Sequence, residues 1–256
     1  MIREKFDLTG KRAFVTGSAR GIGRAIAAGL AEFGAKVVVH GSKPSAPLEE
    51  ALAEVKTWAP DSFAVTGDLS SAGAVADIFA QMRERGVEPD IVICNASIQK
   101  NVPWNEIPLS DMQEQMQVNF NATFQMFQMA YPHMKAQGWG RMIVVGSVQE
   151  QRPHPLMAVY AASKSAQECL VRNLARQISK EGITVNNLCP GVFATDRNRE
   201  ALGNPVYAEK VMNAIPMHDY ARPEDAVGTA VLLASDAGRY ITGATIMIDG
   251  GLRLPG

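Results

Sequence analysis

The chain has 256 residues, of which 46% are hydrophobic and 20% are charged, and its formal net charge is -1. This composition excludes large-scale disorder and supplies enough apolar surface for one hydrophobic core, so we expect one domain over residues 1–256. Because the charges balance, no extended positive field favours a nucleic acid or an anionic membrane surface as a partner.

Short β-branched runs alternate along the chain with longer segments of helical periodicity, which is typical of repeated βαβ units. Several runs are almost wholly apolar, as strands covered on both faces are. The pattern predicts an α/β fold: a single doubly wound domain of the Rossmann type, with a seven-stranded parallel sheet and helices on both faces. In chain order, strands are expected at 12–16, 36–40, 62–66, 91–95, 142–147, 184–189 and 244–249, and helices at 23–33, 48–58, 73–85, 110–137, 159–181 and 223–235.

The stretch 191–219 shows no clear periodicity and contains several Asn and Pro residues. Long loops without regular structure are often functional, so we expect a mobile loop that covers a substrate. An ordinary surface excursion is the alternative.

The side chains that could hold a metal or form disulfides are scattered. The cysteines lack Cys-x-x-Cys spacing and the histidines lack ligand spacing, so we expect no metal, a reducing compartment, and histidines that serve on the surface or in packing. The amino-terminal residues carry no apolar stretch of the secretory type, and no run approaches about 18 apolar residues, so we expect a cytoplasmic protein without a membrane segment. The residues concerned are Cys94, Cys169, Cys189, His40, His133, His154 and His218.

A glycine-rich segment follows the first predicted strand directly and leads into the first predicted helix. A helix amino terminus offers unpaired N–H groups, and residues without Cβ let a pyrophosphate approach the backbone. The segment lacks the Lys-Ser/Thr ending of a nucleoside-triphosphate loop, so we expect dinucleotide binding, with a tight turn that binds nothing as the alternative. The candidate residues are Gly17, Ser18, Arg20, Gly21, Ile22 and Gly23.

The end of the second predicted strand bears on the choice of dinucleotide. NAD(H) sites usually place a carboxylate there for the ribose 2′-hydroxyl, but residues 40–43 read His-Gly-Ser-Lys. Arg20, Ser42 and Lys43 would instead form charge-assisted hydrogen bonds with a 2′-phosphate, so we favour NADP(H) and leave NAD(H) open. Asp68, after the third strand, is a candidate for the adenine amino group or else a turn residue.

A Ser, a Tyr and a Lys point to proton-transfer chemistry. Ser147 ends the fifth predicted strand, at the carboxyl edge of the sheet where α/β proteins bind ligands, and its hydroxyl could polarise a carbonyl there. Tyr160 and Lys164 share one helix face. An isolated Tyr has a pKa of about 10, but a neighbouring ammonium and a positive nicotinamide ring would both favour its phenolate. Tyr160 would then transfer a proton near neutral pH.

Together these segments resemble the short-chain dehydrogenase/reductase family over essentially the whole chain. The family usually shows NNAG where this chain has CNAS, so Ser97 replaces a glycine beside the cofactor. The RPHP sequence before YAASK also resembles the gluconate 5-dehydrogenase branch. The matching segments are TGSARGIG at 16–23, DL at 68–69, CNAS at 94–97, VNF around Asn119, Ser147, YAASK at 160–164 and PGVFAT at 190–195.

The resemblance implies a role for each matching residue. Tyr160 would be the general acid or base, Ser147 would hydrogen-bond the reacting oxygen, and Lys164 would hold the nicotinamide ribose. Asn119 would complete a catalytic tetrad through a helix kink and a water. The family also implies a homotetramer, with the helices 110–137 and 159–181 packed between subunits. Beyond the glycine-rich segment, the predicted cofactor contacts are Gly41, Ser42, Asp68, Leu69, Asn95, Ala96, Tyr160, Lys164, Pro190, Gly191, Val192 and Thr195.

The expected reaction is the NAD(P)-dependent interconversion of a secondary alcohol and a ketone. The loops near the site carry polar side chains, which favour a sugar, a sugar acid or a polyol as substrate unless these side chains are merely solvated. The predicted substrate contacts are Ser147, Gln149, Arg152 and Tyr160, and Gln99, Trp104, Gln151, His154, Asn198 and Arg199 also belong to loops near the cleft mouth.

Two other functions stay open. In a 3-oxoacyl-[acyl-carrier-protein] reductase, the row of Arg172, Arg176 and Lys180 on one helix face could meet the acidic carrier, although such a row is often a solvated or intersubunit face. A dinucleotide-sensing protein that has lost its chemistry is the other possibility, but the complete set of catalytic residues argues against it.

Overall fold

The computed structural model describes residues 1–255, and seven strands within them form one parallel sheet in the order β3-β2-β1-β4-β5-β6-β7. The predicted doubly wound α/β fold is therefore confirmed. Each predicted strand end lies within two residues of the observed one. The strands are β1 Arg12–Val15, β2 Lys36–Gly41, β3 Phe63–Thr66, β4 Ile91–Cys94, β5 Gly140–Val145, β6 Ile183–Pro190 and β7 Thr245–Ile248.

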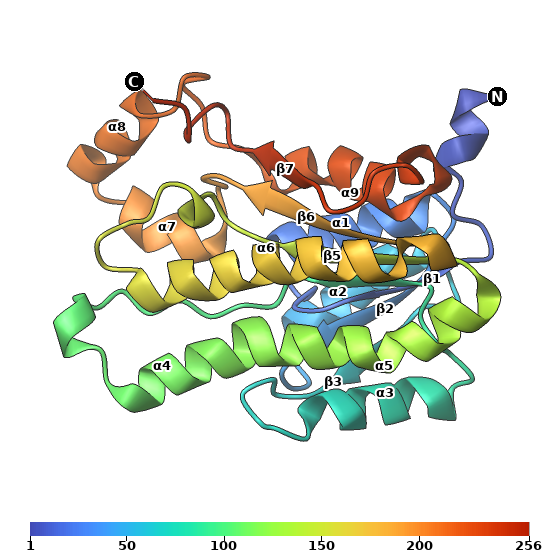
Figure 1. Cartoon of the computed structure of the whole chain (residues 1–256). Coiled ribbons are helices and arrows are strands. Elements are labelled where there is room, and N and C mark those ends of the chain that lie inside the picture. Colours follow the sequence, from blue (N-terminus) through green and yellow to red (C-terminus); the bar gives the residue numbers. More distant parts are fainter. Residues whose placement is uncertain (256) are drawn as a thin grey trace.

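Two layers of helices cover the sheet (Figure 1). Because successive side chains of a strand point to opposite faces, Val15 of β1 packs in the core beneath one layer and Phe14 in the core beneath the other. One layer contains α1 Gly21–Glu32, α2 Ala46–Lys56 and α9 Val227–Ala234, and the other contains α3 Ala74–Glu84, α5 Ala122–Gln137 and α6 Ala158–Ile178. Short 3-10 turns are η1 Ile2–Phe6, η2 Trp104–Glu106, η4 Val148–Glu150, η5 Ser179–Glu181, η6 Pro223–Ala226 and η7 Asp236–Gly238.

The strand order reverses at β1, which pairs with β2 on one side and β4 on the other. In open α/β sheets a crevice forms at the carboxyl ends of the strands where the order reverses. The sheet therefore places the site next to the turn that follows β1.

The helix expected at 110–137 is interrupted. It consists of α4 Leu109–Met116, the π-helical turn η3 Gln117–Asn121, and α5. A π turn widens the helix and redirects backbone carbonyls, and such turns are frequent at functional sites. Asn119 lies within this turn.

The stretch 191–219 contains two helices, α7 Asp196–Leu202 and α8 Pro205–Asn213, so the prediction of a stretch without regular structure was wrong. Asn204 caps α8 by accepting hydrogen bonds from the backbone N–H groups of Val206 and Tyr207, both at 3.1 Å. Neither helix has a buried residue, which explains why no apolar periodicity revealed them. Both lie at the same end of the molecule as the start of α6 (Figure 1).

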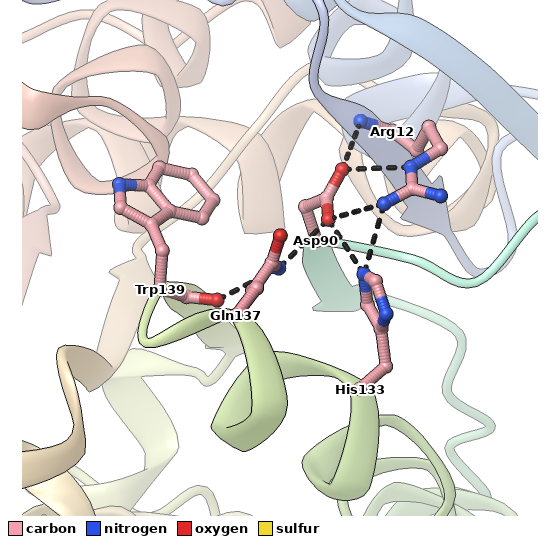
Figure 2. Close-up of polar contacts among 5 residues, drawn as sticks. All are labelled: Arg12, Asp90, His133, Gln137 and Trp139. Atoms are coloured by element: carbon pink, nitrogen blue, oxygen red, sulfur yellow. Dashed lines mark hydrogen bonds and ion pairs between the residues drawn. The ribbon is translucent and has the colours of Figure 1, made fainter.

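A buried carboxylate joins β1, β4 and α5 at the amino ends of the strands (Figure 2). Asp90 accepts hydrogen bonds from Arg12 Nε at 2.9 Å and from Gln137 Nε2 at 2.8 Å, and His133 Nε2 lies 2.8 Å from its Oδ1. Burial alone would raise the pKa of Asp90, but the hydrogen bonds from Arg12, His133 and Gln137 lower it to about 2. The charged form of Asp90 therefore holds these elements together.

Within residues 1–255, no helix is both long and apolar enough to span a membrane. The same part of the chain contains no group of three His, Cys, Asp or Glu side chains that could hold a metal ion. Cys94 and Cys189 are buried and Cys169 is exposed, and all three are free thiols.

Candidate active site

The carboxyl ends of the strands open into a cleft of about 1200 Å³, bordered by the turn after β1, by η4 and by α7 and α8. Most residues predicted to contact cofactor or substrate line this cleft, so the fold brings together segments that are far apart in the sequence. They are Gly17, Arg20, Gly21, Ile22, Gly23, Gly41, Ser42, Asp68, Leu69, Asn95, Ala96, Ser147, Gln149, Tyr160, Pro190, Gly191, Val192 and Thr195.

Four predicted site residues do not line the cleft. Ser18, Asn119 and Lys164 are buried beneath its wall. Arg152 donates a hydrogen bond from Nη1 to the carbonyl of Leu252, so its guanidinium binds the carboxyl-terminal segment. Of the other polar loop residues, Gln99, His154 and Asn198 line the cleft, whereas Trp104, Gln151 and Arg199 lie outside its lining.

The turn after β1 has the geometry of a phosphate cradle. Gly17 and Gly21 adopt φ angles of +62° and +56°, which side chains with a Cβ rarely tolerate. A Cβ on Gly23 would collide with Nδ2 of Asn95 and lie 2.6 Å from the carbonyl oxygen of Gly17. Asn95 Nδ2 donates to that carbonyl at 3.1 Å and so fixes the turn. The backbone of these glycines at the amino terminus of α1 is therefore free of side chains, and its N–H groups could bind an anion there.

His40 supports this turn from below. The backbone N–H of Gly17 donates to Nδ1 of His40 at 3.1 Å, and Nε2 of His40 lies 3.0 Å from the carbonyl of Gly67. Because a carbonyl can only accept, the proton of the neutral ring sits on Nε2. Burial lowers the pKa of His40 to about 4, so the ring stays neutral at physiological pH. The sequence predicted a surface or packing residue and missed this contact, since a lone His in a strand has no informative spacing.

One part of the cleft lining carries positive charge. Arg20, Ser42 and Lys43 line it. Among residues 1–255, no hydrogen bond or ion pair occupies the cationic groups of Arg20 and Lys43, which leaves both available for a phosphate. Asp68 accepts a hydrogen bond from the backbone N–H of Ser70 at 3.0 Å, and this bond lowers the pKa of its carboxyl group. Asp68 thus makes a turn contact while it lines the cleft.

Tyr160 and Lys164 are neighbours on α6, with only 5% and 1% of their surfaces exposed. The Nζ of Lys164 lies 5.8 Å from the centre of the Tyr160 ring and donates to the carbonyl of Val145 at 2.7 Å. Burial, and secondly the charge of Arg197, lower the pKa of Lys164 to about 8. The ammonium therefore persists at neutral pH and acts on the tyrosine in a poorly solvated place.

Ser147 follows β5 and caps η4. Its Oγ accepts a hydrogen bond from the backbone N–H of Gln149 at 3.2 Å, while its own N–H donates to Oε1 of Glu150 at 2.9 Å. Glu150 also accepts a hydrogen bond from Asn187 Nδ2 at 2.8 Å, and burial raises its pKa to about 6. Sequence reasoning missed Glu150, although the Ser-x-x-Glu spacing is that of a capping box.

Asn119 connects the loop after β4 to α6. Its Oδ1 accepts a hydrogen bond from the backbone N–H of Ile98 at 2.9 Å, and its Nδ2 donates to Ser163 Oγ at 3.0 Å. The hydroxyl of Ser163 donates in turn to the carbonyl of Tyr160 at 2.7 Å. The side chain of Asn119 is therefore tied to the helical turn that carries the tyrosine.

Arg197 of α7 reaches across the cleft. Its Nη1 donates to the hydroxyl of Ser97 at 3.0 Å and its Nη2 to the carbonyl of Ser97 at 2.6 Å. Ser97 is the residue that stands where the family usually has glycine, and its hydroxyl is one of the two acceptors. Sequence reasoning selected Asn198 and Arg199 from this segment and missed Arg197.

Comparisons with known proteins show the family of the chain. A family model described as enoyl-(acyl carrier protein) reductase matches residues 17–253. The gluconate 5-dehydrogenase of Gluconobacter oxydans (strain 621H) is 34% identical over 248 residues, which cover 96% of each chain. The chain belongs to the short-chain dehydrogenase/reductase family. It is accordingly an NAD(P)-dependent oxidoreductase, and the predicted family and enzyme class are confirmed.

Solved structures of this family agree closely with the fold. A 3-oxoacyl (acyl-carrier-protein) reductase from Agrobacterium tumefaciens C58 with NADP bound has a TM-score of 0.92 at 37% identity, covering 98% of this chain and 97% of that one. A gluconate 5-dehydrogenase from Burkholderia cenocepacia J2315, in complex with NADP and tartrate, has a TM-score of 0.92 at 30% identity and covers 100% of both chains.

Proposed function

We propose that the protein oxidises a secondary hydroxyl group of a sugar acid to a ketone with NADP⁺, and catalyses the reverse reduction with NADPH. The observation that carries the proposal is the guanidinium of Arg197, which binds Ser97 within the cleft that Tyr160 also lines and whose charge acts on the buried Lys164. A cation at that place would bind the carboxylate of a small substrate through charge-assisted hydrogen bonds. The gluconate 5-dehydrogenases of Gluconobacter and Burkholderia support this substrate class.

The cofactor would lie along the carboxyl edge of the sheet. The open backbone at Gly17, Gly21 and Gly23 suits its pyrophosphate, and the unpaired cations of Arg20 and Lys43 suit a 2′-phosphate. The two relatives with NADP bound support the same preference. When bound, the nicotinamide accepts or supplies the hydride of the reaction.

Tyr160 would move the proton. During oxidation its phenolate accepts the proton of the substrate hydroxyl, and during reduction its phenol returns that proton to the new alkoxide. The ammonium of Lys164 favours the phenolate, while Ser147 Oγ hydrogen-bonds the reacting oxygen. Glu150 keeps the backbone of Ser147 in place for this contact.

Polar side chains around the reacting groups would bind the substrate hydroxyls. Gln149, His154, Gln99 and Asn198 all line the cleft, and each can donate or accept hydrogen bonds. Arg152 would act less directly than the sequence suggests, because its guanidinium holds the carbonyl of Leu252 in the cleft wall.

Reduction of an acyl-carrier thioester is the second candidate, favoured by the similarity to the Agrobacterium reductase. The exposed cations Arg172 and Arg176 lie on α6, and Lys180 lies just beyond it. At 1.5 Å per residue, Arg172 stands about 18 Å along the helix from Tyr160. This row lies toward the end of α6 that is remote from the cleft, which makes it a poor place to dock a carrier.

Initial rates with matched substrates test the proposal. With NADP⁺, we expect kcat/KM for gluconate to exceed that for the neutral polyol sorbitol by about tenfold or more, which corresponds to about 1.4 kcal/mol. Arg197→Gln should remove most of this preference. Arg199→Gln should keep it, because Arg199 lies outside the cleft lining. Faster turnover of an acetoacetyl thioester with NADPH, or equal rates for gluconate and sorbitol, would contradict the assignment.

We further propose that residues 1–256 fold as one domain and work in the cytoplasm as a homotetramer. Leu109 and Met112 of α4 and Phe124 of α5 are exposed by 64%, 41% and 38%, and an apolar helix face of this kind suits contact between subunits. A tetramer of chains of 27.6 kDa should have a mass of about 110 kDa in sedimentation equilibrium measurements. A species of the mass of one chain at micromolar concentration would contradict the tetramer.

A further inference from the structure

Gln167 is a buried polar residue that the mechanism above does not use. It lies on α6 one turn after Lys164, and none of its surface is exposed. Its Oε1 accepts a hydrogen bond from Lys164 Nζ at 3.1 Å. Its Nε2 donates to the carbonyl of Asn119 at 2.5 Å and to Thr123 Oγ1 at 2.8 Å. Both ends of the amide are therefore engaged, as a buried amide requires.

The carbonyl of Asn119 is saturated by these contacts. A backbone carbonyl oxygen has two lone pairs. One accepts the hydrogen bond from Gln167, and the other accepts the hydroxyl of Thr123 at 2.9 Å. The family resemblance implies a helix kink and a water in the proton relay at Asn119. In this chain the amide of Gln167 links the Asn119 carbonyl to the Lys164 ammonium directly.

The contact with Gln167 also bears on the charge of Lys164. An ammonium has three donors, and two of them bind the carbonyl of Val145 and Oε1 of Gln167. Within residues 1–255 the third donor makes no hydrogen bond, and the Tyr160 ring centre lies 5.8 Å from Nζ. Among the charged and titratable groups around this ammonium, Arg197 opposes its charge, whereas Glu150, Cys189 and Cys94 favour it. A neutral acceptor such as Gln167 holds the ammonium without neutralising it.

We propose that Gln167 is a positioning residue of the active site, which fixes the Lys164 ammonium against Tyr160 by bridging it to the Asn119 carbonyl. This inference rests on the proposed proton transfer by Tyr160. Without the amide, the ammonium loses an acceptor in a poorly solvated place and becomes both less stable and less confined. Less positive charge then acts on the phenol, so the phenol ionises at higher pH.

The test compares Gln167→Leu with Thr123→Val. Both positions are buried, and the valine removes hydrogen bonds to Gln167 and Asn119 but none to Lys164. With gluconate and NADP⁺, the acid limb of the kcat profile should move up by about one pH unit or more in Gln167→Leu and stay in place in Thr123→Val. KM should change by less than about threefold, because Gln167 touches no substrate. If the leucine variant does not fold, Gln167→Met is used in its place, because a methionine side chain fits irregular space.

A second readout does not depend on turnover. Ultraviolet titration of the phenol in the protein without cofactor, with Tyr160→Phe as the subtracted background, should show the same upward movement in Gln167→Leu. If Gln167→Leu and Gln167→Met both showed the same pH profile of kcat and the same phenol titration as wild type, the proposal would be overturned. If wild-type protein fails to oxidise gluconate, the sugar-acid assignment fails, and the phenol titration still decides the role of Gln167.

Discussion

The ammonium of Lys164 lies 5.8 Å from the centre of the Tyr160 ring, beneath the wall of the cleft that the tyrosine lines. Their spacing of four residues puts them on one face of α6, and the carbonyl of Val145 at the end of β5 holds the lysine there. Because burial weakens screening, the charge acts on the phenol more strongly than it would in water. In the proposed mechanism, the transfer of the proton depends on this pair.

The preference for NADP(H) should depend on Lys43. We expect Lys43→Ala to weaken NADPH binding by about tenfold or more, since a charge-assisted hydrogen bond to the 2′-phosphate is lost. NADH binding should change by less than about threefold, because NADH lacks that phosphate. Titration calorimetry with both cofactors checks this, with Lys56→Ala on the exposed side of α2 as the control. An equal loss of affinity for NADH and NADPH would mean that Lys43 does not bind the 2′-phosphate.

Folding stability should fall below neutral pH because of His40. Its pKa is lowered from 6.5 in the unfolded chain to about 4 in the fold, so the unfolded state binds more protons between these values. The stabilisation is complete above pH 6.5 and is lost as pH falls toward 4, by about 2 kcal/mol between pH 7 and pH 5. Urea unfolding at the two pH values measures it.

The matched variant is His40→Phe, which keeps a ring against Phe14 and cannot be protonated. It should be less stable than wild type at pH 7, because the N–H of Gly17 loses its acceptor. Between pH 7 and pH 5, the free energy of unfolding of His40→Phe should fall by less than that of wild type. The difference should be about 2 kcal/mol, the amount expected from protonation of His40. An identical pH dependence in the two proteins would show that His40 is not the group responsible.

The Asp90 cluster should support stability without supporting catalysis. Asp90→Asn removes the charge that binds Arg12, and we expect the free energy of unfolding to drop by about 2 kcal/mol at pH 7. Because the pKa of Asp90 is about 2, its contribution is complete above pH 3.8 and is lost as pH falls through 2. kcat should stay near wild type, since Asp90 does not line the cleft. Thermal unfolding checks the stability and initial rates check kcat, with the exposed Asp61→Asn as the control.

The fold was largely predictable because its signals are local. Strands buried on both faces appear as short apolar runs, so the number and the ends of the seven strands could be expected closely. The helices α7 and α8 bury no residue and therefore leave no apolar periodicity. The π turn at Asn119 leaves none either, because its side chains continue the pattern of the flanking helices.

The site was predictable where residues form a motif and not where they meet through the fold. Tyr160 and Lys164 share one helix, so their spacing indicates their contact. Arg197 and Ser97 are 100 residues apart, and no spacing rule connects them. Gln167 looks like an ordinary helix residue until the π turn brings the Asn119 carbonyl to its amide. Arg152 shows the opposite case: a polar loop residue near the site whose guanidinium binds the backbone instead.

The most direct test of proton transfer by Tyr160 measures turnover and NADPH binding together in Tyr160→Phe. General acid and base groups contribute about 100-fold to 10,000-fold to the rate, so we expect kcat to fall by about 1000-fold. The dissociation constant for NADPH should stay within about threefold, because the ring remains in place. Tyr131→Phe, which loses a hydroxyl bonded to Glu181 and Lys135 away from the cleft, should keep wild-type turnover. A Tyr160→Phe protein that binds NADPH normally and retains near-wild-type turnover would contradict the mechanism.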